Sequence, residues 1–274
     1  MTAMISETNL PDGTPVFCLQ AKEVPVLYDQ IQDYLKYGIE IHQGDTIFDV
    51  GANIGLFSLW IYQKCFQEAN IYAFEPIPAV FEVLQANANR VAPERIKVFP
   101  YGLANESKTV EFAYHPHATM LSTAYRDDLP ELQAQLKETM VRNIASAPPV
   151  VSWLRWLPPC FRSWLIQGEL DRAFQTKLVS CRLRTISEII QEQKILRIDL
   201  LKVDVEKGEL DVLLGIEPKD WHKIKQVVVE VHDLDRRLAR ISALLQECGF
   251  TQIKVAQEPI LKDSNLFNIY AWRG

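Results

Sequence analysis

DVGANIGLFS, Asp49 to Ser58, is the stretch of this 274-residue chain that decides the fold. It continues an apolar run, Thr46 to Val50, and opens a segment with helical spacing of apolar residues, Leu56 to Phe66. Gly51 and Gly55 permit a tight turn and a close backbone approach, because glycine has no Cβ. The first N–H groups of a helix have no partners within the helix. The stretch therefore predicts a strand, a turn and a helix, with a polar ligand bound at the turn.

Outward from this turn, short apolar runs alternate with amphipathic stretches, as in parallel strands joined by helices. Strands are predicted at Thr46 to Val50, Ile71 to Phe74, Ile96 to Phe99, Leu200 to Val203 and Val227 to Val231. Helices are predicted at Leu56 to Phe66, Ala79 to Val91 and Leu234 to Cys248, with Thr185 and Glu188 as a capping box for another. Two final strands, Gln252 to Ala256 and Phe267 to Trp272, are predicted to pair as a hairpin. We therefore expect an α/β fold with a doubly wound, Rossmann-like sheet of seven strands, mostly parallel with an antiparallel last strand.

The alternation stops between residues 115 and 179, a stretch rich in Trp, Leu and Arg. It is too long for a loop without structure of its own. We expect helices at Asp128 to Ile144 and Phe161 to Phe174, which would form a helical lid over the open end of the sheet. Residues 1–44 are expected to form an N-terminal helical cap, and residues 45–274 the main domain that carries the lid.

The composition is that of a globular protein, with 48% hydrophobic and 23% charged residues. No stretch has the roughly 20 uncharged apolar residues that span a bilayer. A net charge of -6 offers no basic surface for phosphate backbones, so nucleic acid is not an expected partner. Residues 1–11 have neither a basic region nor an apolar run, and the five cysteines form no C-x-x-C pair. We expect a cytoplasmic protein with reduced thiols, either monomeric or homodimeric.

The acid at the end of the first strand, Asp49, separates two classes of cofactor. Its carboxylate would repel the pyrophosphate of a dinucleotide. S-adenosylmethionine (SAM) carries a sulfonium and an ammonium and no phosphate, so a carboxylate near the turn suits it. Glu75 follows the second strand, where an acid accepts hydrogen bonds from both ribose hydroxyls; capping of the next helix is the alternative. The predicted SAM site comprises Asp49, Gly51, Asn53, Gly55 and Glu75, with Gly102 and Leu103 flanking the adenine.

Four segments resemble the FkbM family of methyltransferases: DVGANIG, AFEP at residues 73–76, LLKVDVEKGELDVLLGI at Leu200 to Ile216, and QVVVEVHD at Gln226 to Asp233. The resemblance runs from about Thr46 onward and is nearest to O-methyltransferase domains of bacterial polyketide and peptide synthetases. It implies a class I methyltransferase fold and methylation of a hydroxyl or enol oxygen, often on an acyl chain carried by an acyl carrier protein. The chain departs from the family at Glu206-Lys207-Gly208, where EG or EKS is common. Whether it is a freestanding enzyme or a synthetase domain stays open.

Methyl transfer to an alcohol oxygen needs a base that removes the hydroxyl proton. His232, just beyond the fifth strand at the carboxyl edge of the sheet, is the candidate base. Glu206 is the candidate partner that holds its imidazole in one tautomer, and Asp204 is expected to contact the methionine part of SAM or the same histidine. Candidate substrate contacts at the mouth of the insertion are His115, His117 and Thr119, with a simple turn as the alternative.

Glu230 would complete a carboxylate cluster with Asp204 and Glu206, and such clusters bind magnesium in some O-methyltransferases. The EVHD segment resembles the metal-independent group, so no metal is expected. Two other functions stay open. The acceptor is a sugar or a free small molecule in one of them, and in the other the chain is a catalytically silent interaction domain.

Overall fold

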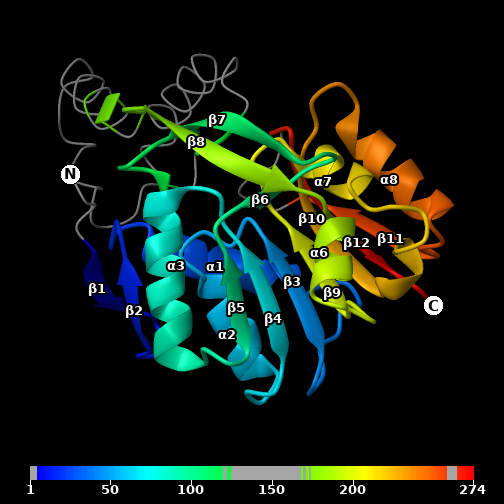
Figure 1. The fold of residues 1–274 in the computed structure, drawn as a ribbon, viewed down its shortest axis with the longest axis horizontal. Coiled ribbons are helices and arrows are strands. Elements are labelled where there is room, and N and C mark those ends of the chain that lie inside the picture. The colour runs from blue at the N-terminus through cyan, green and yellow to red at the C-terminus, as the bar shows by residue number, and fades with distance from the viewer. Residues whose placement is uncertain (1–4, 120–121, 125–167, 169–170, 173, 258–263) are drawn as a thin grey trace, which may run out of the picture.

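The centre of the computed structural model is a seven-stranded sheet in the order β11-β12-β10-β9-β3-β4-β5 (Figure 1). The structure describes residues 5–119, 122–124, 168, 171–172, 174–257 and 264–274. The strands of this sheet are β3 (Thr46–Val50), β4 (Asn70–Phe74), β5 (Ile96–Phe99), β9 (Leu200–Val203), β10 (Gln226–His232), β11 (Gln252–Ala256) and β12 (Leu266–Trp272). Strand β12 is antiparallel to β10 and β11, and the other pairs are parallel. The predicted fold class is confirmed.

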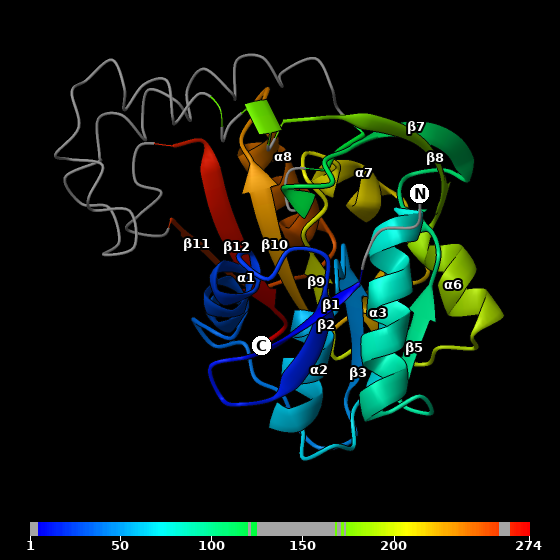
Figure 2. The same cartoon turned by 90° about the vertical axis from the view of Figure 1, so that its left-hand side faces the viewer.

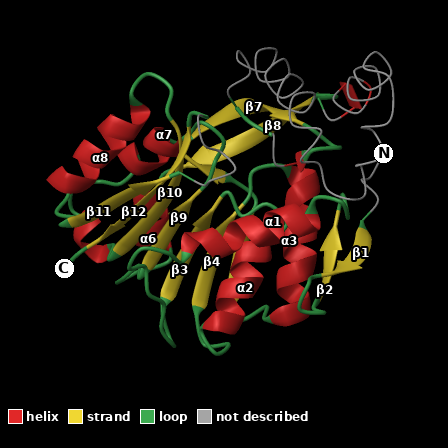
Figure 3. Ribbon diagram, turned by 180° about the vertical axis from the view of Figure 1, so that it is seen from behind, coloured by secondary structure: helices red, strands yellow, loops and turns green. Residues whose placement is uncertain are grey.

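Successive side chains of a strand point to opposite faces of the sheet. Because these strands are apolar at successive positions, both faces of the sheet are apolar. Ile47, Ile71 and Leu200 belong to one core, and the next residue of each strand belongs to the other. The first core includes residues of α1 (Val24–Ile31), α2 (Leu56–Lys64) and α3 (Pro78–Val91). The second includes residues of α6 (Ile186–Glu192), α7 (Glu209–Leu214), α8 (Arg237–Glu247) and the 3-10 helix η5 (Trp221–Lys223). The two groups of helices cover opposite faces, as Figures 1 and 3 show.

Local signals set the ends of these helices. The predicted capping box is present: Thr185 Oγ1 accepts a hydrogen bond from Glu188 N at 3.2 Å, and Glu188 Oε2 accepts one from Thr185 N at 3.0 Å. Helix α8 begins at Arg237 and not at the predicted Leu234. Asp235 and Arg236 have φ of 53° and 59°, and this left-handed backbone cannot continue a right-handed helix. None of the described helices is long and apolar enough to cross a lipid bilayer.

A second, three-stranded sheet lies over the carboxyl ends of the central strands (Figure 1). It consists of β6 (Gly102–Leu103), β8 (Lys177–Arg184) and β7 (Lys108–Tyr114), and β7 pairs antiparallel with β8. The apolar pattern of the sequence does not predict this small sheet. Residues 115–176 join β7 to β8, so the insertion is the connection of a hairpin and ends before residue 179. The predicted helix Asp128–Ile144 and most of the predicted helix Phe161–Phe174 lie outside the described residues.

The N-terminal segment is only partly helical, so the prediction of a helical cap over residues 1–44 is wrong for its first part. Strands β1 (Ser6–Asn9) and β2 (Pro15–Cys18) form a hairpin beside α3 (Figure 2), and α1 and the 3-10 helix η1 (Gln32–Tyr34) follow. The turn at Asp12-Gly13 explains the hairpin, because Asp12 Oδ1 accepts a bond from Thr14 N at 2.9 Å and Gly13 has a φ of 87°. The side chain of Asn87 in α3 holds the hairpin through the backbone of Phe17: its Oδ1 accepts from Phe17 N at 2.8 Å, and its Nδ2 donates to the Phe17 carbonyl at 2.9 Å.

Candidate active site

A cavity of about 310 Å³ lies at the carboxyl edge of the central sheet. Its floor is formed by the residues that follow β3, β4 and β9, and residues of β6, β7 and β8 line the side of the small sheet. Helices α1 and η1 supply a further part of the wall through Leu27, Gln30, Ile31 and Tyr34. Ligands of open α/β sheets bind at this edge.

The predicted glycine turn forms one end of the cavity. Gly51 has a φ of 80°, and a Cβ added there would lie 1.7 Å from the carbonyl oxygen of Asp204. Only glycine therefore allows the end of β3 to approach the end of β9 so closely. Gly51 and Asn53 line the cavity, whereas Gly55 sits behind the turn at the start of α2 with a φ of 91°.

Asp49 lies beneath the turn and is not among the described residues that line the cavity. Its side chain is fully buried, accepts a hydrogen bond from Ser58 Oγ at 2.7 Å and pairs with Lys202 Nζ at 3.1 Å. Lys202 therefore neutralises the Asp49 carboxylate, which was predicted to attract the positive charges of SAM. Asp49 thus supports the turn from below, with its carboxyl group paired to Ser58 and Lys202.

Glu75, at the end of β4, lines the cavity with a nearly buried carboxyl group. The carboxyl accepts backbone hydrogen bonds from Asn53 at 3.1 Å and Ile77 at 2.9 Å. The alternative prediction that Glu75 caps α3 is wrong, because the N-cap residue is Ile77 and no side chain caps the helix. Burial raises the pKa of Glu75 to about 7, although both backbone bonds oppose the shift. Gly102 and Leu103 also line the cavity.

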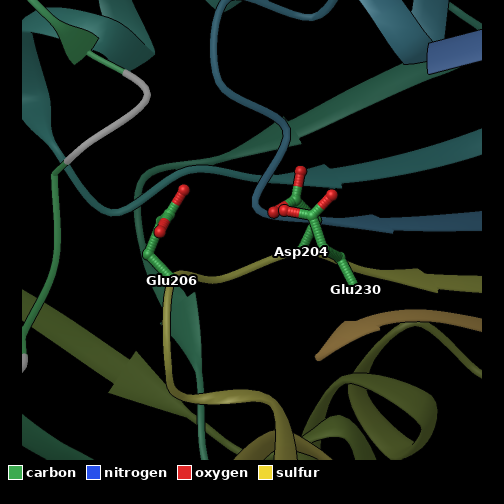
Figure 4. Close-up of side chains that lie close together, drawn as sticks. All are labelled: Asp204, Glu206 and Glu230. Carbon is green, nitrogen blue, oxygen red and sulfur yellow. The ribbon is translucent and has the colours of Figure 1, made fainter. Parts of the chain in front are cut away.

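Three carboxyl groups form an acidic cluster in the cavity, and Figure 4 shows their positions. Oxygens of Asp204, Glu206 and Glu230 all lie within 4.8 Å of one another, an arrangement that suits a cation. Lys202 Nζ lies 3.5 Å from Asp204, which also accepts a hydrogen bond from Tyr34 at 3.0 Å. Burial alone would lower the pKa of Lys202, but the carboxylates of Asp49 and Asp204 raise it, so the ammonium remains charged.

His232 lies next to this cluster at the end of β10. Its Nε2 is 3.4 Å from Glu206 Oε2, as the predicted pairing requires. Its Nδ1 makes the shorter contact, 2.8 Å to Oε1 of Glu209, which the sequence analysis did not single out. Glu209 is fully buried at the start of α7, and Arg237 Nη1 donates to its other oxygen at 3.0 Å. Glu209 is therefore the residue that fixes the imidazole.

The three residues predicted as substrate contacts separate in the structure. Thr119 lines the cavity, and its N–H and hydroxyl donate to Glu23 at 2.9 and 2.8 Å. His115 and His117 are not among the described residues of the cavity wall. His115 is fully buried, its ring contacts Phe174 edge-on, and its Nδ1 lies 3.5 Å from the Thr176 hydroxyl.

Three residues that hold side chains of the candidate site were not predicted: Glu23, Lys202 and Glu209. The sequence carries a signal for two of them, because Lys202 and Glu209 belong to the same KVDVEKGE segment as Asp204 and Glu206. Glu23 precedes the first strand of the sheet, and no local pattern connects it to Thr119. Tyr34 belongs to the N-terminal segment that was predicted as a cap, and it lines the cavity.

The sheet order, the antiparallel last strand and the cavity at the carboxyl edge define a class I SAM-dependent methyltransferase. A crystal structure of methyltransferase FkbM from Methylobacillus flagellatus has this fold, with a TM-score of 0.51 and 14% identity over 85% of this chain and 45% of that one. The chain belongs to the methyltransferase FkbM domain family, whose profile matches residues 49–251.

Two relatives support the assignment along the chain. The 31-O-demethyl-FK506 methyltransferase FkbM of Streptomyces tacrolimicus is 34% identical over 100% of this chain and 99% of its own length. The AMB antimetabolite synthetase AmbE of Pseudomonas aeruginosa is 33% identical over 97% of this chain, which corresponds to 12% of that protein. SAM is accordingly the cofactor of this enzyme.

Proposed function

We propose that the chain transfers the methyl group of SAM to a hydroxyl oxygen of a polyketide-type or peptide-type intermediate, with His232 as the general base. The observation that carries the proposal is the fixed imidazole. Glu209 holds Nδ1 at 2.8 Å, and Nε2 faces Glu206 of the cavity at 3.4 Å. A base held in this way beside the cofactor cavity suits removal of a hydroxyl proton.

The charges of the cavity suit the cationic donor. Asp204, Glu206 and Glu230 line it together with two described lysines, and each lysine already has an acidic partner: Lys108 pairs with Glu106 and Lys202 with Asp49. The surplus of carboxyl groups favours a sulfonium and an ammonium and disfavours a pyrophosphate. Glu75 would accept hydrogen bonds from the ribose hydroxyls of SAM, and Gly102 and Leu103 would flank its adenine ring. SAM supplies an electrophilic methyl group, and the protein supplies alignment and the base.

The proposed acceptor class rests on the relatives. One is named as a methyltransferase of 31-O-demethyl-FK506, and another is an antimetabolite synthetase. The second relative favours an acyl chain on a carrier protein as the form in which the acceptor arrives. A sugar is the second candidate, because the hexuronic acid methyltransferase AglP of Haloferax volcanii is 27% identical over 70% of this chain.

Intact-protein mass spectrometry tests the proposal. A β-hydroxyacyl carrier protein is incubated with SAM and the enzyme, and with the variant His232→Ala. We expect a gain of one methyl mass that falls about 100-fold in rate in the variant, while a calorimetric titration with S-adenosylhomocysteine stays unchanged. The exposed His222 provides a matched control, His222→Ala, which should retain full activity.

Other outcomes contradict particular parts of the proposal. Methylation of free sugars with none of the carrier-bound chain would replace the acceptor class. Full turnover in His232→Ala would remove the base. Turnover that EDTA abolishes and magnesium restores would assign the acidic cluster to a metal, and absence of donor binding would indicate a silent domain.

A further inference from the structure

Glu206 lies between the cavity and His232. It is one of the residues that line the cavity, whereas His232 is not among the described lining residues. The nearest approach of the imidazole to this acid is the 3.4 Å between His232 Nε2 and Glu206 Oε2. An acceptor hydroxyl in the cavity therefore meets the Glu206 carboxyl group before it meets the imidazole.

Glu209 determines which nitrogen of His232 carries the proton. Its oxygens accept from the backbone N–H of Lys207 at 2.8 Å and from Arg237 Nη1 at 3.0 Å. Burial alone would raise the pKa of Glu209, but its hydrogen bonds with His232 and with the backbone lower it, so the group is a carboxylate. Since a carboxylate only accepts, Nδ1 of the neutral His232 is the protonated nitrogen, and Nε2, which lies 3.4 Å from Glu206 Oε2, carries the electron pair.

Glu206 is held in a position that favours its neutral form. Burial and the neighbouring Asp204, Glu230 and Glu209 raise its pKa well above the ordinary value. Its backbone is left-handed, with a φ of 49°, and its carbonyl accepts a hydrogen bond from Thr123 Oγ1 at 2.8 Å. A non-glycine residue with left-handed backbone costs free energy, and such strained residues are common at functional sites.

We propose that the Glu206 carboxylic acid is the catalytic residue that contacts the acceptor hydroxyl and relays its proton to His232, with Glu209 as the positioning residue. This inference rests on the proposed function. The acceptor oxygen bonds to the methyl carbon as the carbon–sulfur bond breaks. The hydroxyl proton moves to Glu206 Oε1, and the proton on Oε2 moves to His232 Nε2. Glu206 ends neutral as it began, and the imidazolium, paired with Glu209, then loses its proton to water.

Nitrogen NMR of the protein without donor tests the positioning step. With ¹⁵N-labelled histidine, the spectrum separates the two neutral tautomers of each of the five histidines, and His232→Gln assigns the signal. We expect His232 to be protonated at Nδ1 in the wild type and in Glu206→Gln, and to lose this preference in Glu209→Gln. An Nε2-protonated His232 in the wild type would overturn the inference, as would an unchanged tautomer in Glu209→Gln.

Kinetics test the relay step. Glu206→Gln keeps the shape of the side chain but cannot accept one proton while releasing another, so kcat should fall about 100-fold with little change in donor KM. Glu206→Asp should recover part of that loss, and Glu247→Gln on the exposed face of α8 is the matched control. Wild-type kcat in Glu206→Gln would show that the hydroxyl reaches His232 directly.

The two proposals fail separately. An Nδ1-protonated His232 that depends on Glu209, in a protein that methylates no hydroxyl, would leave the charge arrangement intact and refute the proposed function. Hydroxyl methylation that depends on His232 but not on Glu206 would retain the proposed function and refute the relay.

Discussion

The glycine turn and the Glu209–His232–Glu206 chain border the same cavity, but different forces hold them in place. At the turn, the absence of a Cβ on Gly51 lets two strand ends meet, and the neighbouring groups are mainly backbone. At the other end, three titratable side chains from β10, α7 and the loop after β9 depend on one another's charge. Sterics therefore dominate at the glycine turn, and electrostatics dominate at the Glu209–His232–Glu206 chain. Substitutions of shape and of charge should affect the two ends differently.

The largest effect is expected from Gly51→Ala, which tests the steric part of the comparison. The new Cβ would lie 1.7 Å from the Asp204 carbonyl, so the free energy of unfolding should fall by about 4 kcal/mol or more, with loss of donor binding. Gly44→Ala is the control, because Gly44 has a similar φ of 82° and no atom within 4 Å of the added Cβ. It should cost about 1 kcal/mol in chemical denaturation. Equal losses in both variants would mean that backbone strain alone makes Gly51 necessary.

A smaller effect is expected from the pH dependence at Glu75, a titratable group that lines the cavity beside the glycine turn. Its folded pKa of about 7 exceeds the ordinary 4.5, so the protein favours protonated Glu75 and loses stability as pH rises between these values. The ribose hydroxyls of the ligand donate hydrogen bonds, and the ionised carboxylate of Glu75 accepts them better than the protonated acid does. As the pH is lowered below 7, the affinity for S-adenosylhomocysteine should therefore decrease, and the decrease should approach about tenfold for each pH unit.

Calorimetric titrations of Glu75→Gln over the same pH range complete this test. The variant should bind more weakly and lose the pH dependence, whereas Glu82→Gln on the exposed side of α3 should behave as the wild type. A pH dependence that persists in Glu75→Gln would assign it to the acidic cluster at the other end of the cavity.

The smallest effect is expected from Tyr34→Phe, which tests the link between the N-terminal segment and the acidic cluster. The buried hydroxyl of Tyr34 donates to Asp204 at 3.0 Å, and a hydrogen bond to a charged group contributes about 1.5 kcal/mol. We expect that loss in the free energy of unfolding. Tyr28→Phe removes an exposed bond of 3.3 Å to Asp12 and should cost much less. Identical stabilities of the two variants would contradict the link.

Tertiary contacts explain why some site residues were not predictable. Asp49 ends its strand as expected, yet Lys202 of the adjacent strand neutralises it, and strand adjacency is not written in the local sequence. Glu209 reaches His232 only because α7 begins beside the end of β10, 23 residues away in sequence. Strand β7 was missed because its first four residues are mostly exposed and polar, which weakens the apolar pattern that marks a strand.

The sequence by itself determined the central sheet, the glycine turn and the candidates Glu75, Asp204, Glu206 and His232. Those features depend on short-range chemistry: apolar runs for strands buried on both faces, glycine for left-handed backbone, and residues at the strand ends that parallel pairing brings to one edge. Only the tertiary structure decided the partners of each charge and the wall formed by α1 and η1. Pairing of charges depends on distances of a few ångströms between segments far apart in the chain, because the interaction falls off with separation and depends on burial.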